Sequence, residues 1–439
     1  MRCLIVSLES FQKGIIPEEV RQYILSQSQQ PFIVLDESSK IKTNNPCKES
    51  KKSKRTQAIM RLNRVGERCI LTGTFMSKSP VNAYDQMNFL CPDFFPESIW
   101  SFAEHYEIRR SLKSVRGARV LLSQKDYEAI YKRLNKARTD PMNYSLRGLM
   151  DGVMAFYGIS EEACKWIYEH PEYSPFKNVD ELWNRIGNTC MRAERKFLKD
   201  LPPKLYKTYN IPLTKEQLKL YLQLQNTNCT DNIAVDNGLK LYLRFQDICN
   251  GYEPIDGGEV IGKDGKPHHL VKLHPLAENP KLDLLEEIVE DIGDKQIVVW
   301  CSRTVLLYDA EQRLREKGYT TAIYDGKIDK KAREDGYNSF AEGKTQIIFV
   351  NQASGAYGLN GLKEADYAIY LCNSYSVEHR AQSEDRIYRG EITRSKYIID
   401  ISCEGTCEER VTEALKVGKE LIDSGETDPE IFKYTGGEV

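Results

Sequence analysis

The sequence predicts an α/β protein whose strands form parallel sheets. In the last third of the chain, short apolar runs alternate with stretches of helical periodicity, which favours a parallel sheet covered by helices on both faces. A helix is expected to begin at Lys281, and a second one over residues 305–317 is expected to end at Gly318. The expected strands are QIVVW (296–300), QIIFV (346–350), YAIYL (367–371) and KYIIDI (396–401).

The first ninety residues predict a shorter unit of the same kind. Strands are expected over Cys3–Leu8, Phe32–Leu35 and Arg68–Leu71, with a helix over Glu18–Ser26 between the first two.

Two further segments have a different character. Residues 95–200 are rich in aromatic and charged side chains and show helical periodicity without strand runs, so a helical insertion is expected there. Residues 251–275 carry Gly-Gly and Asp-Gly pairs between short β-forming runs, which predicts a β-hairpin.

Composition restricts the class of protein. A chain of 439 residues is expected to form two or three domains. Its 62 basic residues against 64 acidic ones give no overall positive charge, so any basic surface must be local. No run of 18 apolar residues is present, which excludes a predicted membrane span. Twelve cysteines occur singly without a CxxC pair and no targeting signal is seen, so we expect reduced thiols in an intracellular protein, cytoplasmic or nucleoid-associated.

The first chemical motif is an acidic pair after a strand. FIVL ends in Asp36 and Glu37, and the carboxyl end of a parallel strand is where ligands bind. In nucleotide hydrolysis, one such carboxylate holds Mg²⁺ and the next orients and deprotonates the attacking water. The alternative is that Asp36 caps a helix.

Two further motifs also follow strands. CILTGTF ends in Thr72, Gly73 and Thr74, whose hydroxyl groups can couple a nucleotide site to a second lobe; the alternative is a simple turn. SGAYGLN (354–360) follows QIIFV, and its glycines let the backbone approach a ligand while its polar side chains can contact phosphates; the alternative is a flexible loop.

The fourth motif is QSEDRIYR (382–389). Gln382, Arg386 and Arg389 recur at spacings of four and three, which on a helix places them on one face. Two guanidinium groups on one face suit a triphosphate, and an arginine finger is worth roughly 10³–10⁵ in rate. The alternative is a solvated face on which Glu384 and Asp385 are the local partners.

Together, the order and spacing of these motifs resemble the superfamily-two helicase-like ATPases, in particular the Swi/Snf-type DNA translocases. The resemblance covers nearly the whole chain apart from residues 113–185 and 252–275, and implies two RecA-like lobes that bind ATP between them and move on DNA, usually duplex DNA. Other stretches that carry it are RTQAIMRLNRVGERCILTGTF, SPVNAYDQMNFLCPDFFP, LPPKLYKTYNIPLTKEQLKLY (201–221), YLRFQDICNGY, NPKLDLLEEIV, YDGKIDKKAREDGYNSFAEGK and GTCEERV (405–411).

The resemblance implies roles for particular residues. Asp36 would hold Mg²⁺ and Glu37 would be the catalytic base. The remainder of the ATP site would come from Gly358, Asn360, Gln382, Arg386 and Arg389. DNA contacts would come from Thr72, Gly73, Thr74, Ser302, Ser354 and Gly355.

One basic segment and one group of possible metal ligands complete the candidate residues. Residues 40–55, including Lys40 and Lys42, form a basic segment that suits phosphate contact or is simply a solvated loop. A metal site from His268, His269, His274 and Cys249 is disfavoured because no pair has zinc-site spacing.

This chain departs from the family pattern in three places. Ser38-Ser39 follow the acidic pair where the family usually has Ala-His, and Phe75 stands where it usually has Pro. The third departure is the largest, because no GxxxxGK[ST] phosphate-binding loop occurs in the 439 residues. We therefore expect a truncated first lobe, or a subunit whose first lobe another chain completes.

The expected organisation is a truncated RecA-like lobe 1 over 1–95, a helical insertion over 96–200, and RecA-like lobe 2 over 201–439 with a hairpin insertion at about 251–275. Two functions follow. One is an ATP-dependent DNA translocase. The other is an ATPase-inactive fragment, or a DNA-binding or regulatory subunit that needs another chain to supply the phosphate-binding loop.

Overall fold

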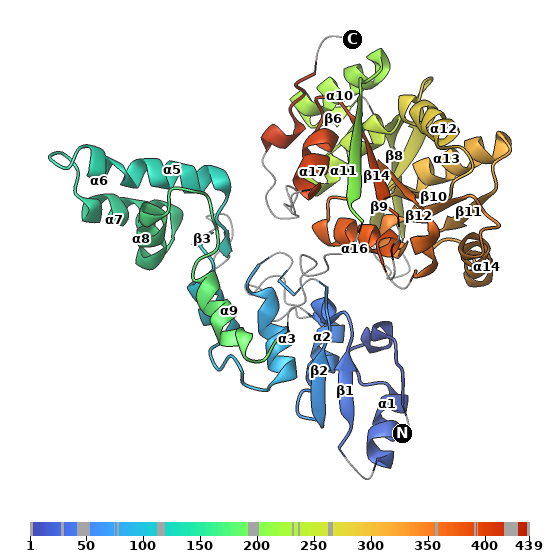
Figure 1. Cartoon of the computed structure of the whole chain (residues 1–439). Helices are drawn as coiled ribbons and strands as arrows, with labels where there is room; N and C mark the ends of the chain where they lie inside the picture. Colours follow the sequence, from blue (N-terminus) through green and yellow to red (C-terminus); the bar gives the residue numbers. More distant parts are fainter. Residues whose placement is uncertain are drawn as a thin grey trace. The chain divides into compact units, whose positions relative to one another are not determined.

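The computed structural model divides into two compact units, Met1–Ala193 (unit 1) and Glu194–Val439 (unit 2) (Figure 1). No described helix is long and apolar enough to span a bilayer. The structure describes residues 3–27, 30–41, 53–73, 75–76, 79–111, 119–191, 202–230, 232–235, 238–261, 267–355, 359–389, 392, 394–416 and 429–436.

Unit 2 is built on a six-stranded parallel sheet, in the order β11-β12-β10-β13-β14-β5. The four predicted strands are all confirmed, while β5 and β11, at the two edges of the sheet, are not among them. The strands are β5 (Lys204–Ile211), β10 (Ile297–Cys301), β11 (Thr321–Tyr324), β12 (Ile347–Asn351), β13 (Tyr367–Cys372) and β14 (Lys396–Cys403).

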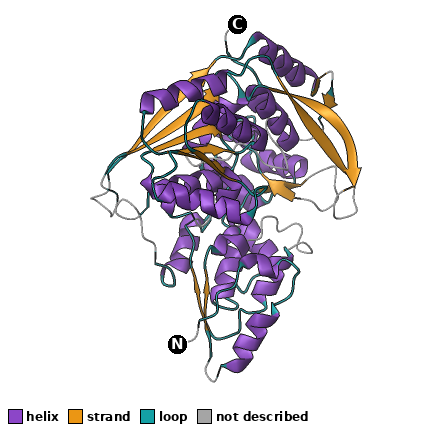
Figure 2. Ribbon diagram, turned by 90° about the vertical axis from the view of Figure 1, so that its right-hand side faces the viewer, coloured by secondary structure: helices purple, strands orange, loops and turns teal. Residues whose placement is uncertain are grey.

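Helices cover both faces of this sheet, as Figure 2 shows. Side chains alternate along β10, so that Val299 joins one core and Trp300 the other. On one side lie α12 (Pro280–Ile292) and α13 (Thr304–Glu316); on the other lie α14 (Lys330–Ala341) and α16 (Val377–Ile387). Gly318, with a φ of 96°, follows the end of α13 as predicted.

A third core of unit 2 joins the helices α10 (Lys215–Thr227), α11 (Gly238–Cys249) and α17 (Cys407–Lys416). The predicted hairpin is confirmed as the antiparallel pair β8 (Tyr252–Ile261) and β9 (Pro267–Pro275). The smaller elements are β6 (Cys229–Thr230), β7 (Ile233–Ala234), α15 (Gln352–Gly355), η5 (Gly361–Glu364) and η6 (Pro429–Phe432).

Unit 1 begins with a small α/β part. Strands β1 (Phe32–Leu35) and β2 (Glu67–Ile70) pair in parallel, and α1 (Glu18–Ser26) precedes them, all as predicted to within one residue. The other elements are η1 (Leu8–Phe11), η2 (Ser38–Ile41), α2 (Lys54–Met60) and α3 (Asn82–Leu90).

The strand predicted over Cys3–Leu8 is wrong. Residues 3–7 are irregular, η1 begins at Leu8, and Ile5 is 91% exposed. An apolar run becomes a strand only where a neighbouring strand pairs with its backbone, and no strand among the described residues of unit 1 does so.

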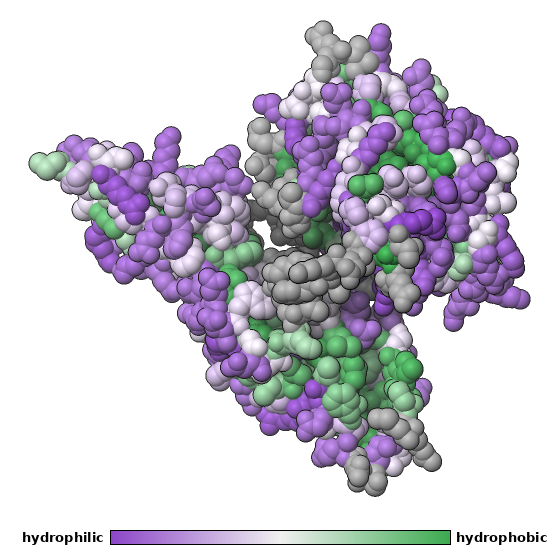
Figure 3. Space-filling model, in the orientation of Figure 1, coloured by the Kyte–Doolittle hydropathy of each residue, from purple (hydrophilic) through white to green (hydrophobic). Residues whose placement is uncertain are grey.

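One face of the β1–β2 pair is apolar and exposed. Leu35 packs into the core beneath the strands, whereas Phe32, Val34 and Leu71 remain 64%, 50% and 49% exposed. Figure 3 shows apolar side chains gathered over this part of unit 1. Parallel sheets are normally covered on both faces, so this exposed face is unusual.

The rest of unit 1 is mostly helical. Its helices are α4 (Ile99–Tyr106), α5 (Gln124–Leu134), α6 (Lys136–Thr139), α7 (Leu146–Tyr157), α8 (Glu161–Glu169) and α9 (Val179–Gly187). Serine side chains cap α5, α7 and α8, each accepting a hydrogen bond from an amide of the first turn. A short antiparallel pair, β3 (Arg109–Ser111) and β4 (Arg119–Leu121), interrupts the region where only helices are predicted.

Candidate active site

The acidic pair lies directly after β1, at its carboxyl end. Leu35 is buried, the Asp36 side chain is exposed and Glu37 is half-buried. Asp36 Oδ1 accepts a hydrogen bond of 2.9 Å from the Glu37 amide, and the next helical turn begins only at Ser38, so Asp36 does not cap a helix. Both carboxylates therefore stand where a parallel strand presents ligand-binding groups.

The backbone of Glu37 is strained. Its φ of 51° lies in the left-handed region, where a residue with a Cβ costs about 1–3 kcal/mol and persists only if its surroundings hold it there. The following residue supplies that restraint, because the Ser38 amide donates to the Leu71 carbonyl at 2.9 Å.

Gln86 on α3 connects this turn to the loop after β2. Its Oε1 accepts from Ser38 Oγ at 2.7 Å, and its Nε2 donates to the carbonyls of Phe75 and Asn82, both at 2.7 Å. Gln86 and Ser38 are fully buried. The serine that departs from the family pattern thus makes a specific contact, and one amide side chain ties the acidic turn to the loop that follows Thr72 and Gly73.

The other candidate site residues of unit 1 lie in the loop after β2 and in or beside η2. Thr72 is half-buried, and Gly73 is exposed with open space where a Cβ would stand. Thr74 and Lys42 lie outside the described residues. Lys40 is half-buried in η2, and its carbonyl accepts from Arg55 Nη2 at 3.4 Å.

In unit 2, several candidates lie at the carboxyl edge of the sheet. The Ser302 amide donates to the Cys372 carbonyl at 2.9 Å and its Oγ donates to the Asn373 carbonyl at 3.1 Å. Ser354 and Gly355 belong to α15, which begins directly after β12, while Gly358 lies outside the described residues. Because β12, β10 and β13 are parallel neighbours, Ser302 and α15 lie on one edge.

The arginine motif is only partly helical. Gln382 and Arg386 lie on α16 as predicted, but the helix ends at Ile387, so the expectation that Arg389 shares their face is wrong. Tyr388 leaves the helical conformation with a ψ of 63°, and its hydroxyl donates to the Pro202 carbonyl.

The three motif side chains have different surroundings. Gln382 is half-buried and donates to Glu378 Oε1 at 3.4 Å, and Arg386 is buried at 9% exposure. Arg389 is exposed, and its Nη1 donates to Asn360 Oδ1 at 2.9 Å. The structure thus brings together two of the residues expected to bind nucleotide, Asn360 and Arg389.

A further arginine on α16 lies outside the predicted motif. Arg380, 2% exposed, donates through Nη2 to Asp400 Oδ2 at 3.0 Å and through Nε to Glu384 Oε1 at 2.7 Å, and its guanidinium lies 3.6 Å from the Tyr370 ring centroid. Burial acts to raise the pKa of Glu384, but Arg380 and Lys204 outweigh it and hold that pKa below its usual value. Arg380 therefore has a structural role within unit 2.

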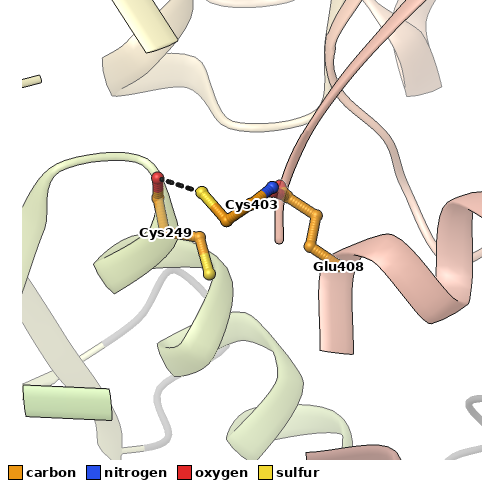
Figure 4. A group of neighbouring side chains, drawn as sticks. All are labelled: Cys249, Cys403 and Glu408. Carbon is orange, nitrogen blue, oxygen red and sulfur yellow. Dashed lines mark hydrogen bonds between the residues drawn. The ribbon is translucent and has the colours of Figure 1, made fainter. Parts of the chain in front are cut away.

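Figure 4 shows a second buried group, Cys249, Cys403 and Glu408, whose ligand atoms lie within 4.8 Å of one another. Lys281 Nζ stands 2.5 Å from Glu408 Oε1, and both side chains are at most 1% exposed. Burial opposes the charge of Lys281, but Glu408 outweighs that effect and raises the lysine pKa.

These residues do not fit a metal ion. Burial raises the pKa of the Cys249 thiol well above its ordinary value, so this thiol stays protonated, and its Cys403 neighbour donates Sγ–H to the Cys249 carbonyl at 3.3 Å. The lysine ammonium already supplies the positive charge beside the carboxylate. The histidine alternative gains no support, since the side chains of His268 and His269 lie outside the described residues.

Comparison with known proteins agrees with this arrangement of motifs. The family model "SNF2-related domain" matches residues 3–251, and "Helicase conserved C-terminal domain" matches residues 280–391. The chain therefore belongs to the SNF2-related, helicase-like ATPase family.

Individual relatives are distant. The chain is 21% identical to the TATA-binding protein-associated factor BTAF1 of Arabidopsis thaliana, over 88% of this chain and 18% of that protein. It is 23% identical to the human SWI/SNF-related matrix-associated actin-dependent regulator of chromatin subfamily A member 1, over 52% of this chain and 22% of that protein. The chain thus spans about a fifth of the length of these curated relatives.

Among solved structures, the Sulfolobus solfataricus SWI2/SNF2 ATPase core in complex with dsDNA is 17% identical, with a TM-score of 0.36, over 92% of this chain and 72% of that chain.

Proposed function

We propose that the chain is an ATP-dependent DNA translocase of the Swi/Snf type, which couples ATP hydrolysis to movement along duplex DNA. The main observation behind the proposal is the acidic turn of unit 1. Glu37 is held in a strained conformation beside the exposed Asp36, and the buried Gln86 ties the turn to a second family motif. Such strain is typically retained where it serves chemistry.

In this proposal, Asp36 holds Mg²⁺. A carboxylate is the ligand type that Mg²⁺ prefers, and the exposure of Asp36 leaves room for the water ligands that this ion keeps. When bound, Mg²⁺ neutralises charge on the phosphates. Glu37 orients and deprotonates the attacking water. Arg389, positioned by Asn360, provides a guanidinium group for the phosphates, with Gln382 and Arg386 as further unit 2 contributors.

The proposed DNA contacts come from Thr72, Gly73 and Thr74 in unit 1 and from Ser302, Ser354 and Gly355 in unit 2, all of which follow strands closely in the sequence. Hydroxyl and backbone N–H groups bind phosphates without reading the base sequence. The protein would act where DNA is found, in the cytoplasm or at the nucleoid.

The direct test is ATP hydrolysis by the purified chain with and without duplex DNA. DNA should stimulate hydrolysis, and Glu37→Gln should lower kcat by about 10²–10⁴ because it removes the proton acceptor. Glu67→Gln is a matched control, since Glu67 is an exposed carboxylate at the other end of the same two-stranded sheet. Failure to bind ATP at millimolar concentration would contradict the proposal for this chain.

The second candidate function is a DNA-binding or regulatory subunit that needs another polypeptide for ATP hydrolysis. No GxxxxGK[ST] loop occurs in the chain, and the backbone N–H groups of such a loop bind the nucleotide phosphates. The exposed apolar face of Phe32, Val34 and Leu71 favours this candidate, because a further polypeptide layer would cover it. DNA-stimulated hydrolysis by the chain alone, abolished by Glu37→Gln, would exclude it.

A further inference from the structure

The helical part of unit 1 carries a compact group of basic side chains at the junction of α5 and α6. Lys132 and Arg133 occupy the last turn of α5, and Lys136 and Arg138 lie on α6; we call these four residues the basic tip. All four are exposed. Of the nearest acidic residues in the sequence, Glu128 accepts a hydrogen bond from Gln124 at 2.8 Å, and Asp140 accepts two from Asn143, both at 3.1 Å.

The basic tip differs from most of the other described basic side chains of the same helical region, which have carboxylate partners. Examples are Arg109–Glu107 at 2.5 Å, Arg110–Asp126 at 3.0 Å, Arg147–Glu161 at 2.9 Å and Lys177–Glu162 at 2.6 Å. Within the part of the chain that the structure describes, no ion pair involves any of the four basic-tip residues. Their positive charge is therefore left uncompensated.

Neutral aromatic rings position two of these cations, Arg138 and Lys136. The Arg138 guanidinium lies 4.0 Å from the centroid of the Tyr168 ring, and Lys136 Nζ lies 5.3 Å from that of Tyr144. Arg133 lies against α7, where the missing side chain of Gly152 gives it room, since a Cβ there would stand 2.6 Å from Nη2. An aromatic face positions a cation without cancelling its charge, so Arg138 and Lys136 keep their positive charge.

We propose that the basic tip binds the sugar–phosphate backbone of duplex DNA. This inference rests on the proposed function, which supplies DNA as the partner. The net charge of the whole chain is −2, so long-range attraction to DNA cannot come from overall charge and requires a local basic surface. Each Lys or Arg that neutralises a phosphate releases condensed counterions, which makes the binding strong at low salt and independent of sequence.

The test is the salt dependence of binding to a fluorescently labelled duplex, measured by anisotropy with the full chain. Lys132→Gln/Lys136→Gln should weaken binding about equally for duplexes of different sequence. It should also reduce the slope of log K against log[salt] by about 2, or about 1 for each phosphate that is no longer neutralised. Both side chains are exposed, so the fold should be kept, and thermal unfolding checks this.

The matched control is Lys330→Gln/Lys344→Gln, which removes the same charge from exposed lysines that have carboxylate partners, Glu334 at 3.8 Å and Glu342 at 2.6 Å. It should leave the slope unchanged. An unchanged slope in the Lys132/Lys136 variant, with normal binding by the wild type, would overturn the basic-tip proposal alone. Absence of duplex binding by the wild-type chain would overturn the proposed function as well.

Discussion

Replacing Lys281 by Met should destabilise unit 2 strongly. The ammonium of Lys281 lies 2.5 Å from Glu408 Oε1 and donates to Asn250 Oδ1 at 2.8 Å and to the Leu371 carbonyl at 3.3 Å. Removing one partner of a buried pair leaves the other charge uncompensated, at a cost of about 3–5 kcal/mol. Two acceptors also lose their donor, so we expect a value near the upper end, about 4–5 kcal/mol.

The double variant Lys281→Met/Glu408→Gln should cost less than Lys281→Met alone, about 1–2 kcal/mol, because no unpaired charge is left inside the protein.

The assay must report on unit 2 alone, since two compact units need not unfold together. Buried thiols can report on the unfolding of each unit separately. Cys301 and Cys372 lie in the unit 2 sheet and Cys164 lies in the helical core of unit 1, all at 0% exposure. Pulsed thiol labelling in urea, followed by mass spectrometry, gives the urea concentration at the midpoint of unfolding for each cysteine. For m of about 2 kcal/mol/M, Lys281→Met should lower the Cys301 and Cys372 midpoints by about 2 M and leave that of Cys164 unchanged.

The control for this experiment is Lys330→Met, which removes an exposed lysine 3.8 Å from Glu334 and should change stability by less than about 0.5 kcal/mol. A destabilisation below about 1 kcal/mol in Lys281→Met would contradict the prediction, since it would mean that the Glu408 charge is not buried or is solvated at little cost.

Three further outcomes are expected. Gln86→Leu should destabilise unit 1 by about 2–4 kcal/mol in urea unfolding, because it leaves Ser38 Oγ and two carbonyls without their partner; a change below about 0.5 kcal/mol would mean that these groups find water instead. Glu37→Gly should raise the urea midpoint of unit 1 by an amount equivalent to about 1 kcal/mol, because glycine accepts a φ of 51° without strain. The same change removes the proposed catalytic base. A lower urea midpoint would show that the turn is unstrained. EDTA should leave the thermal unfolding of unit 2 unchanged, since a lysine ammonium already pairs with the carboxylate of the Cys-Cys-Glu group, and a lower Tm on chelation would reveal a bound metal.

The central strands of unit 2 could be predicted because each is buried on both faces and reads as a continuous apolar run. The edge strands could not. Strand β5 has mostly exposed side chains, KLYKTYNI, and pairs on one side only, so its strand conformation depends on the neighbour β14 rather than on its own pattern. The opposite holds at Cys3–Leu8, where an apolar run without a partner strand stays irregular.

The positions of the candidate site residues could be predicted from strand ends, but their contacts could not. Asp36 and Ser302 follow strands as expected. Gln86 is 48 residues from Ser38 in the sequence, and only the packing of α3 against the acidic turn brings the two together. A lone glutamine in a helix carries no pattern that distinguishes it from a solvated residue.

The arginines of α16 show why spacing alone does not identify a phosphate ligand. Arg380 is almost fully enclosed by Asp400, Glu384 and the Tyr370 ring, so its charge is already compensated within unit 2. Arg389 lies beyond the end of the helix, exposed, with a single described hydrogen bond to the neutral amide of Asn360. A neutral partner positions a guanidinium without compensating its charge, which is what an anion-binding arginine requires. The chemical partner of the side chain therefore discriminates better than its position in a motif.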